Sequence, residues 1–149
     1  MSRVNGRTPA QLYALTVGGA LVFVGIVGFF YSAAFDSPGK VHAVLGLLDV
    51  NGWHNVVHIV SGVAGLLALG YAASRGYALA LGVAYLGIAV WGAALGNGQS
   101  ILGFIPVNTE DTVLHAIIGL CGLVAYAATP AVPPPTTRPE AEAPAAGAP

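Results

Sequence analysis

The sequence predicts an all-α integral membrane protein, a four-helix bundle built from two tandem, parallel two-helix repeats. Three observations favour this fold class: the composition, four long apolar stretches and a duplicated motif. The 149 residues are 56% hydrophobic and only 7% charged, whereas soluble domains carry about 25% charged residues. The mean hydropathy of +0.76 indicates a chain that lies in the bilayer, so lipid is its first expected partner.

The four apolar stretches cover residues 12–34, 53–73, 77–95 and 112–128. Each is long enough to span most of a ~30 Å hydrocarbon core at 1.5 Å per residue. None contains Asp, Glu, Lys or Arg, which is what the cost of charge in lipid requires. We therefore expect a transmembrane domain over residues 1–128.

The first stretch follows a basic segment, as a signal peptide does. It is longer than the usual 7–15-residue apolar region of a signal peptide, and we expect it to remain as a helix. Residues 74–76, which include Arg75, predict a tight connection between the second and third helices. The halves of the bundle would then cover about 12–73 and 77–128. The Pro/Ala-rich residues 129–149 predict a disordered cytoplasmic tail.

One motif occurs twice. Residues 45–69 align without gaps with residues 102–126, and ten of the 25 aligned positions are identical. The identities include Val50/Val107, Asn51/Asn108, His58/His115, Gly62/Gly119 and Gly65/Gly122. Because each half holds two spans, the repeats would be parallel and related by a pseudo-two-fold axis along the membrane normal.

The distribution of basic residues predicts the orientation. Arg3, Arg7, Arg75 and Arg138 fall on one side of the predicted spans, and Lys40 falls on the other. Cytoplasmic loops of membrane proteins carry an excess of basic residues. We therefore expect both termini to lie in the cytoplasm and the protein to lie in the cell (inner) membrane. Nothing in the sequence offers a basic patch for nucleic acid.

Glycines predict where the helices touch, because small residues drive helix association in lipid. The expected contact positions are Gly62, Gly65 and Gly70 in the second helix and Gly82, Gly87, Gly92 and Gly96 in the third. The loops before the second and fourth helices carry apolar residues. They predict short interfacial or partly re-entrant segments that fold over the outer end of the bundle.

Polar residues gather where the second and fourth helices begin. Asn51 and Asn108 are expected to be structural N-caps, and Asp111 would follow at the third helical position. His54 and His58 stand at i, i+4, and their aligned counterparts Asp111 and His115 have the same spacing, so each pair shares one helix face. These four side chains are candidate metal ligands.

Three interpretations of the histidines remain open from sequence. His58 and His115 could bind a haem or, together with His54 and Asp111, a transition metal such as Zn, Fe or Cu. They could instead donate hydrogen bonds to loop carbonyls or to the Asn side chains and so hold the loops in place. A third interpretation is a path for protons or small solutes. No nucleophile–base pair, phosphate loop or carboxylate dyad is visible, so no catalytic residue is predicted.

The segments VNGWHNVVH and VNTEDTVLH resemble the signature of a bacterial membrane family catalogued as domain of unknown function 4383. The resemblance covers residues 11–128, and its pattern is matched by His54, Asn55, His58, Asn108, Asp111 and His115. It implies a four-span membrane protein and brings no established activity or cofactor.

The leading expectation from sequence is therefore a small structural or accessory membrane subunit, associated with lipid and with other membrane proteins. A haem- or metal-binding redox protein is the first alternative, and small-solute or proton transport is the second.

Overall fold

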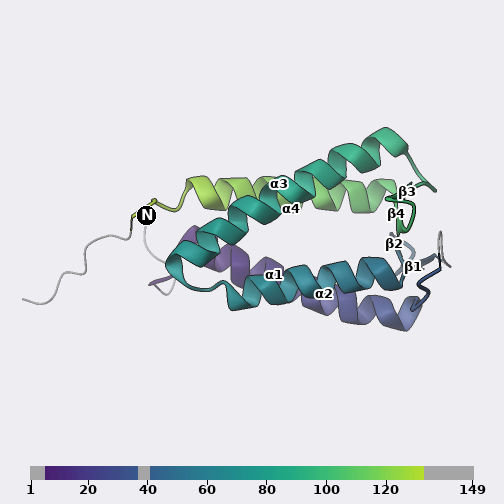
Figure 1. The fold of residues 1–149 in the computed structure, drawn as a ribbon, viewed down its shortest axis with the longest axis horizontal. Helices are drawn as coiled ribbons and strands as arrows, with labels where there is room; N and C mark the ends of the chain where they lie inside the picture. Colours follow the sequence, from purple (N-terminus) through teal and green to yellow (C-terminus); the bar gives the residue numbers. More distant parts are fainter. Residues whose placement is uncertain (1–5, 37–40, 133–149) are drawn as a thin grey trace, which may run out of the picture.

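The computed structural model describes residues 6–36 and 41–132, which contain four α-helices: α1 (Pro9–Tyr31), α2 (Gly52–Leu67), α3 (Tyr71–Leu95) and α4 (Thr109–Ala127). Helix α1 packs along α2, and α3 packs along α4 (Figure 1). The predicted all-helical fold is confirmed.

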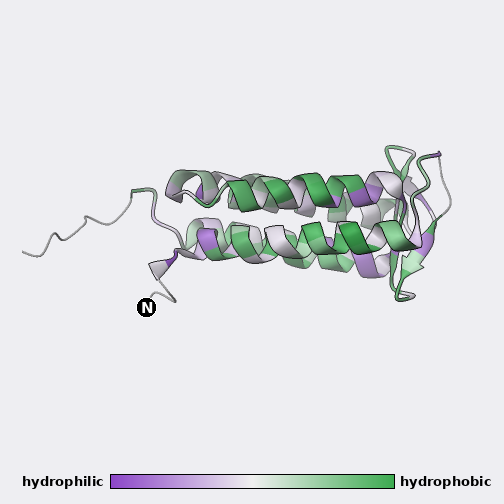
Figure 2. Ribbon diagram, turned by 90° about the horizontal axis from the view of Figure 1, so that it is seen from below, coloured by the Kyte–Doolittle hydropathy of each residue, from purple (hydrophilic) through white to green (hydrophobic). Residues whose placement is uncertain are grey.

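Helices α1, α3 and α4 have 23, 25 and 19 residues and are long and apolar enough to cross a membrane. Helix α2 has 16 residues, or about 24 Å at 1.5 Å per residue. Hydrophobic residues run along the helices (Figure 2), and most of each spanning segment is not buried inside the protein. Those apolar surfaces suit a lipid environment, as in a membrane protein.

The predicted boundary between the second and third helices was wrong. Helix α2 ends at Leu67 and α3 begins at Tyr71, so residues 74–76 lie inside a helix. Ser74 is buried and its hydroxyl donates to the Tyr71 carbonyl. Arg75 donates from Nε to the Thr129 carbonyl and lies 4.0 Å from the Tyr126 ring centre. The charge of Arg75 suggested a connection between helices. Arg75 lies within a helix instead, because its partners Tyr126 and Thr129 come from the far end of the sequence.

The two loops before α2 and α4 are β-hairpins. Strand β1 (His42–Val44) pairs antiparallel with β2 (Leu48–Val50), and β3 (Ser100–Ile101) pairs with β4 (Ile105–Pro106). Each turn has a leucine and a glycine with positive φ. In the first turn φ is 53° at Leu45 and 73° at Gly46, and in the second it is 54° at Leu102 and 78° at Gly103. Two successive positive φ values are typical of type I′ turns. Paired strands therefore replace the expected re-entrant segments.

Both hairpins lie at one end of the bundle, and the described ends of the chain lie at the other (Figure 1). Residues 1–5, 37–40 and 133–149 are not described, so Arg3, Lys40, Arg138 and most of the predicted tail lie outside the described part. Thr129, placed in the tail by its sequence, is only 1% exposed. Its hydroxyl accepts from the Ala10 amide and donates to the Ala125 carbonyl.

Glycine contacts hold the two helices of each pair together. A Cβ on Gly62 would lie 2.6 Å from the Gly18 carbonyl oxygen, and one on Gly119 would lie 2.8 Å from the backbone nitrogen of Leu86. Of the predicted contact positions, Gly62, Gly65, Gly82 and Gly92 have such close neighbours. A Cβ at Gly70, Gly87 or Gly96 would meet no described atom within 4 Å.

Two tyrosines connect the helix pairs. The Tyr13 hydroxyl of α1 donates to the Ile118 carbonyl of α4, and the Tyr77 hydroxyl of α3 donates to the Ser61 carbonyl of α2. The two rings lie 6.2 Å apart, centre to centre. They occupy a buried cluster with Leu21 and other apolar side chains between the pairs.

Candidate functional site

Four ionisable side chains converge just below the hairpins. His54 and His58 come from α2, and Asp111 and His115 come from α4. All four are buried, and one potential ligand atom from each lies within 4.8 Å of the others. The structure thus brings together every residue of the candidate metal set.

The helix starts fix the positions of these side chains. Asn51 caps α2, with its Oδ1 accepting from the His54 amide at 2.9 Å. Asn108 caps α4 in the same way, with its Oδ1 accepting from the Asp111 amide at 2.8 Å. The i, i+4 spacing then places His58 and His115 one turn deeper on the same faces. Capping and ligand position are therefore coupled through one backbone turn in each helix.

Asp111 lies between two of the histidines. Its Oδ2 is 3.6 Å from His54 Nε2 and 3.6 Å from His115 Nδ1. In a tetrahedral zinc site with bonds of 2.0–2.1 Å, neighbouring ligand atoms are separated by about 3.4 Å. Two of the ligand separations are therefore close to those of a metal centre, and the widest, 4.8 Å, would have to shorten.

The tautomer of His54 follows from its other nitrogen. Nδ1 lies 3.0 Å from the Asp49 carbonyl oxygen, which can only accept, so Nδ1 carries a hydrogen. In a neutral ring, the Nε2 lone pair then faces the Asp111 carboxylate. Two electron-rich atoms at that distance repel unless a proton or a metal cation lies between them. A histidine whose second nitrogen bonds to a carbonyl is also the usual arrangement of a metal ligand.

His58 has polar atoms with no partner. Its ring is 3% exposed, and among the described residues neither Nδ1 nor Nε2 has a hydrogen-bond partner. Asp111 Oδ1 and His54 Nε2 share this condition. Leaving a buried polar group unpaired costs about 1–3 kcal/mol. One interpretation of the sequence was that His58 holds the loops by hydrogen bonds, but no described acceptor or donor is in reach.

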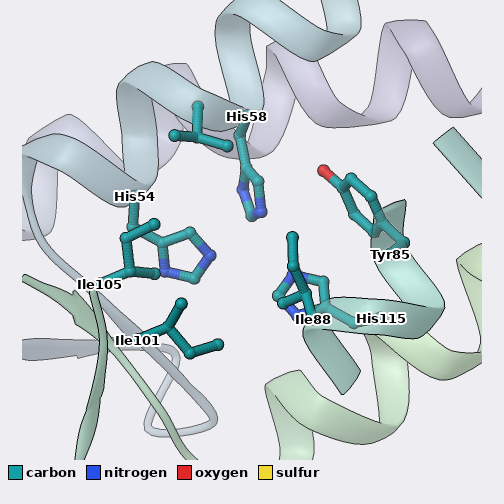
Figure 3. A pocket seen from close by; sticks show the side chains of 8 residues that line it. His54, His58, Tyr85, Ile88, Ile101, Ile105 and His115 are labelled. Atoms are coloured by element: carbon teal, nitrogen blue, oxygen red, sulfur yellow. The ribbon is translucent and has the colours of Figure 1, made fainter. Parts of the chain in front are cut away.

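A small cavity of about 30 Å³ adjoins the histidines. Figure 3 shows the three imidazoles and the Tyr85 hydroxyl around it. The lining residues are His54, Val57, His58, Tyr85, Ile88, Ile101, Ile105 and His115. This volume accommodates an ion with a water-sized ligand. A porphyrin is many times larger and does not fit, so the haem interpretation has no space in this conformation.

Acidic groups surround the outer side of the cluster. Asp49 lies in β2, outside the helices; burial raises the pKa of its carboxyl, and the negative charges of Asp111 and Glu110 raise it further. Burial is the larger cause, and only the smaller part of the shift, which Asp111 and Glu110 produce, reports negative charge near the cluster.

Asn55 and Tyr85 both lie near the cluster. Asn55, which matches the family pattern, lies against α1 instead: its Nδ2 donates to the Ser32 carbonyl at 2.8 Å. Tyr85 was not singled out from sequence, and its ring packs edge-on against His115 at 4.9 Å. One signal could have found it. Aligning the first and third spans on their Tyr-Ala-Leu segments places Tyr85 opposite Leu21, a polar group where the other half is apolar.

The model of the family described as domain of unknown function (DUF4383) matches residues 11–128. The chain belongs to this family. The DUF4383 match contains both hairpins and all four residues of the cluster, and it confirms the resemblance seen in the sequence. No curated protein and no solved structure matches the chain. The family description names no activity, so the functional argument rests on the cluster itself.

Proposed function

We propose that this protein is a membrane metal-binding protein, with one transition-metal ion held by His54, His58, Asp111 and His115. The observation that carries the proposal is the convergence of four buried ligand atoms within 4.8 Å, several of them without hydrogen-bond partners. Uncompensated polar groups of this kind are costly in a membrane protein. One divalent cation would compensate His54 Nε2, the Asp111 carboxylate and one nitrogen of His58, and the second His58 nitrogen would keep no described partner.

The donor set indicates the class of metal. Three imidazoles and one carboxylate are borderline ligands that suit Zn²⁺, Fe²⁺, Co²⁺ or Cu²⁺. The described cluster has no thiolate, which soft ions such as Cu⁺ prefer; Cys121, the single cysteine, is exposed and is not among the four ligands. We assign the site to a borderline divalent ion.

The ion would join the two halves of the bundle. Two ligands come from α2 and two from α4, while the closest helix packing is within the pairs α1–α2 and α3–α4. We further propose that the halves are tandem repeats, that α2 completes a fourth membrane span, and that both termini are cytoplasmic. Matching Leu-Gly turns and matching Asn caps support the duplication. On this topology the metal lies near the outer membrane surface.

A zinc titration tests the proposal. Protein purified in mild detergent competes with a chromophoric chelator for zinc, and we expect one ion per chain. His58→Ala and His115→Ala should each weaken binding by about 100-fold or more, because even changes to groups that only orient a ligand cost 10–100-fold. The matched control is His42→Ala, since His42 lies in β1 outside the cluster and is exposed. Equal zinc affinity in all four proteins would overturn the proposal.

A second candidate is the structural role expected from sequence, in which the cluster holds the hairpins without an ion. The bond from His54 Nδ1 to the Asp49 carbonyl favours it, because this contact ties α2 to β2 directly. The two candidates differ in the metal-free protein. A structural role predicts that His54→Ala destabilises chelator-treated protein, whereas a metal role predicts that most of the loss appears only when zinc is present.

A further inference from the structure

We propose that the bound metal takes a fifth ligand beside its four protein ligands, and that this ligand is a small exogenous anion or hydroxide that accepts a hydrogen bond from Tyr85. This inference rests on the metal site proposed above and deepens it. A site closed by its protein ligands serves structure alone, whereas an open position allows the ion to bind a further molecule.

The cavity supplies the space. Its volume of about 30 Å³ lies among the three imidazoles, and Asp111 is not part of its lining. A water molecule requires at least about 10–15 Å³ of such space. The ion, held between the histidines and Asp111, therefore has room beside it for a water-sized ligand on the side away from the carboxylate.

Tyr85 supplies a hydrogen-bond donor. In Figure 3 its hydroxyl points toward His58 across the cavity. Among the described residues, the hydrogen-bond partner of this hydroxyl is Ser61 Oγ, at 3.4 Å. Ser61 already donates to the Val57 carbonyl at 2.7 Å, so the Tyr85 proton would point toward Ser61 in a long, weak bond. An anion on the metal is a stronger acceptor and would take that proton.

The remaining walls restrict what can enter. Val57, Ile88, Ile101 and Ile105 are apolar, and apart from the histidines only Tyr85 brings a polar side chain to the described lining. A ligand in the cavity would then make two polar contacts, one bond to the metal and one hydrogen bond. This combination selects a compact or linear ligand such as hydroxide or azide and excludes larger oxyanions that need several donors.

Cobalt and azide provide the test. Co²⁺ takes the place of a borderline ion, and its visible d–d bands change when the coordination number changes. Azide added to the cobalt-loaded protein should shift these bands saturably. Tyr85→Phe should leave cobalt affinity unchanged and weaken azide binding about 10–100-fold, the effect of losing one hydrogen bond to a charged group. Tyr13→Phe is the control, because that hydroxyl donates to the Ile118 carbonyl.

The outcomes separate the two proposals. Failure to bind cobalt would overturn the metal site itself, and this inference with it. Stoichiometric cobalt with a spectrum that azide does not alter would leave the metal site intact and show that its coordination is closed. An azide shift that is equally strong in Tyr85→Phe would keep the open position but remove the role given to Tyr85.

Discussion

Asn51 and Asn108 each cap their own helix and donate to the opposite hairpin. Asn51 Nδ2 donates to the Phe104 carbonyl at 2.5 Å, and Asn108 Nδ2 donates to the Leu47 carbonyl at 2.6 Å. The two acceptors are aligned positions of the duplicated motif. Each amide therefore fixes the start of a ligand-bearing helix and ties it to the other half.

Replacing either asparagine with serine should remove its hydrogen bond to the opposite hairpin and keep the helix cap. Serine caps a helix about as well as asparagine, but its hydroxyl is too short to reach the opposite hairpin. We expect Asn51→Ser to lower the free energy of unfolding by about 1 kcal/mol, because the partly buried Phe104 carbonyl loses its donor. Unfolding followed by circular dichroism in mixed micelles measures this. Asn51→Ser with the stability of the unmodified protein would show that the tie contributes nothing.

Glycine substitutions should distinguish helix contacts from open positions. Gly62→Ala forces a methyl group against the Gly18 carbonyl, and overpacking of this kind costs about 1–3 kcal/mol. Gly87→Ala is the matched control. No described atom would lie within 4 Å of its Cβ, and alanine favours helix by up to about 1 kcal/mol. Equal stabilities of the two variants would contradict the assigned packing.

The turn at Leu45 should tolerate substitution unusually well. A left-handed conformation costs a residue such as leucine about 1–2 kcal/mol, and asparagine adopts it more readily. Leu45 is 79% exposed, so Leu45→Asn should raise thermal stability. Leu47→Asn, at a residue that is 56% exposed and has no positive φ, should not. A lower melting temperature for Leu45→Asn would indicate that the leucine side chain contributes a contact, such as one with lipid.

Thr129 should matter despite its place at the edge of the Pro/Ala-rich segment. Thr129→Val keeps the shape but leaves the buried Ala10 amide without its acceptor, a loss of about 1–3 kcal/mol. Thr16→Val is the control, since that hydroxyl is exposed and donates within its own helix. Comparable unfolding curves for the two valine variants would mean that the chain ends are not coupled through Thr129.

Zinc should stabilise the protein in a pH-dependent way. At 100 times the dissociation constant, an ion that binds only the folded state adds about 2.7 kcal/mol. The gain should shrink as the pH is lowered, because imidazoles have to lose their protons to bind. Asp111→Asn should reduce the gain at every pH. Melting temperatures that do not respond to zinc near neutral pH would argue against binding to the folded bundle.

The bilayer explains why so much of the fold could be predicted. Spans without charge and paired glycines such as Gly62 and Gly119 leave few alternatives to a helical bundle. Helix ends were harder, because Arg75 finds its partners in Tyr126 and Thr129 at the far end of the sequence. The hairpins were missed because Leu-Gly is an unusual type I′ turn, and because strands of two or three residues are too short to show a period.

The residues of the candidate site were named from the sequence, but the distances between them were not. The i, i+4 spacing put His54 with His58 and Asp111 with His115. The duplicated motif also led us to expect the two pairs to form one ligand set, but the distances between them and the small cavity, which excludes haem, come from the three-dimensional arrangement. Tyr85 enters from α3, with no local motif to mark it.

X-ray absorption spectroscopy of the zinc-loaded protein tests the central claim most directly. The account predicts nitrogen or oxygen ligands at about 2.0–2.1 Å, with the outer-shell scattering of three imidazoles, reduced to two in His115→Ala. Zinc bound without imidazole scattering, or with an unchanged spectrum in His115→Ala, would contradict it.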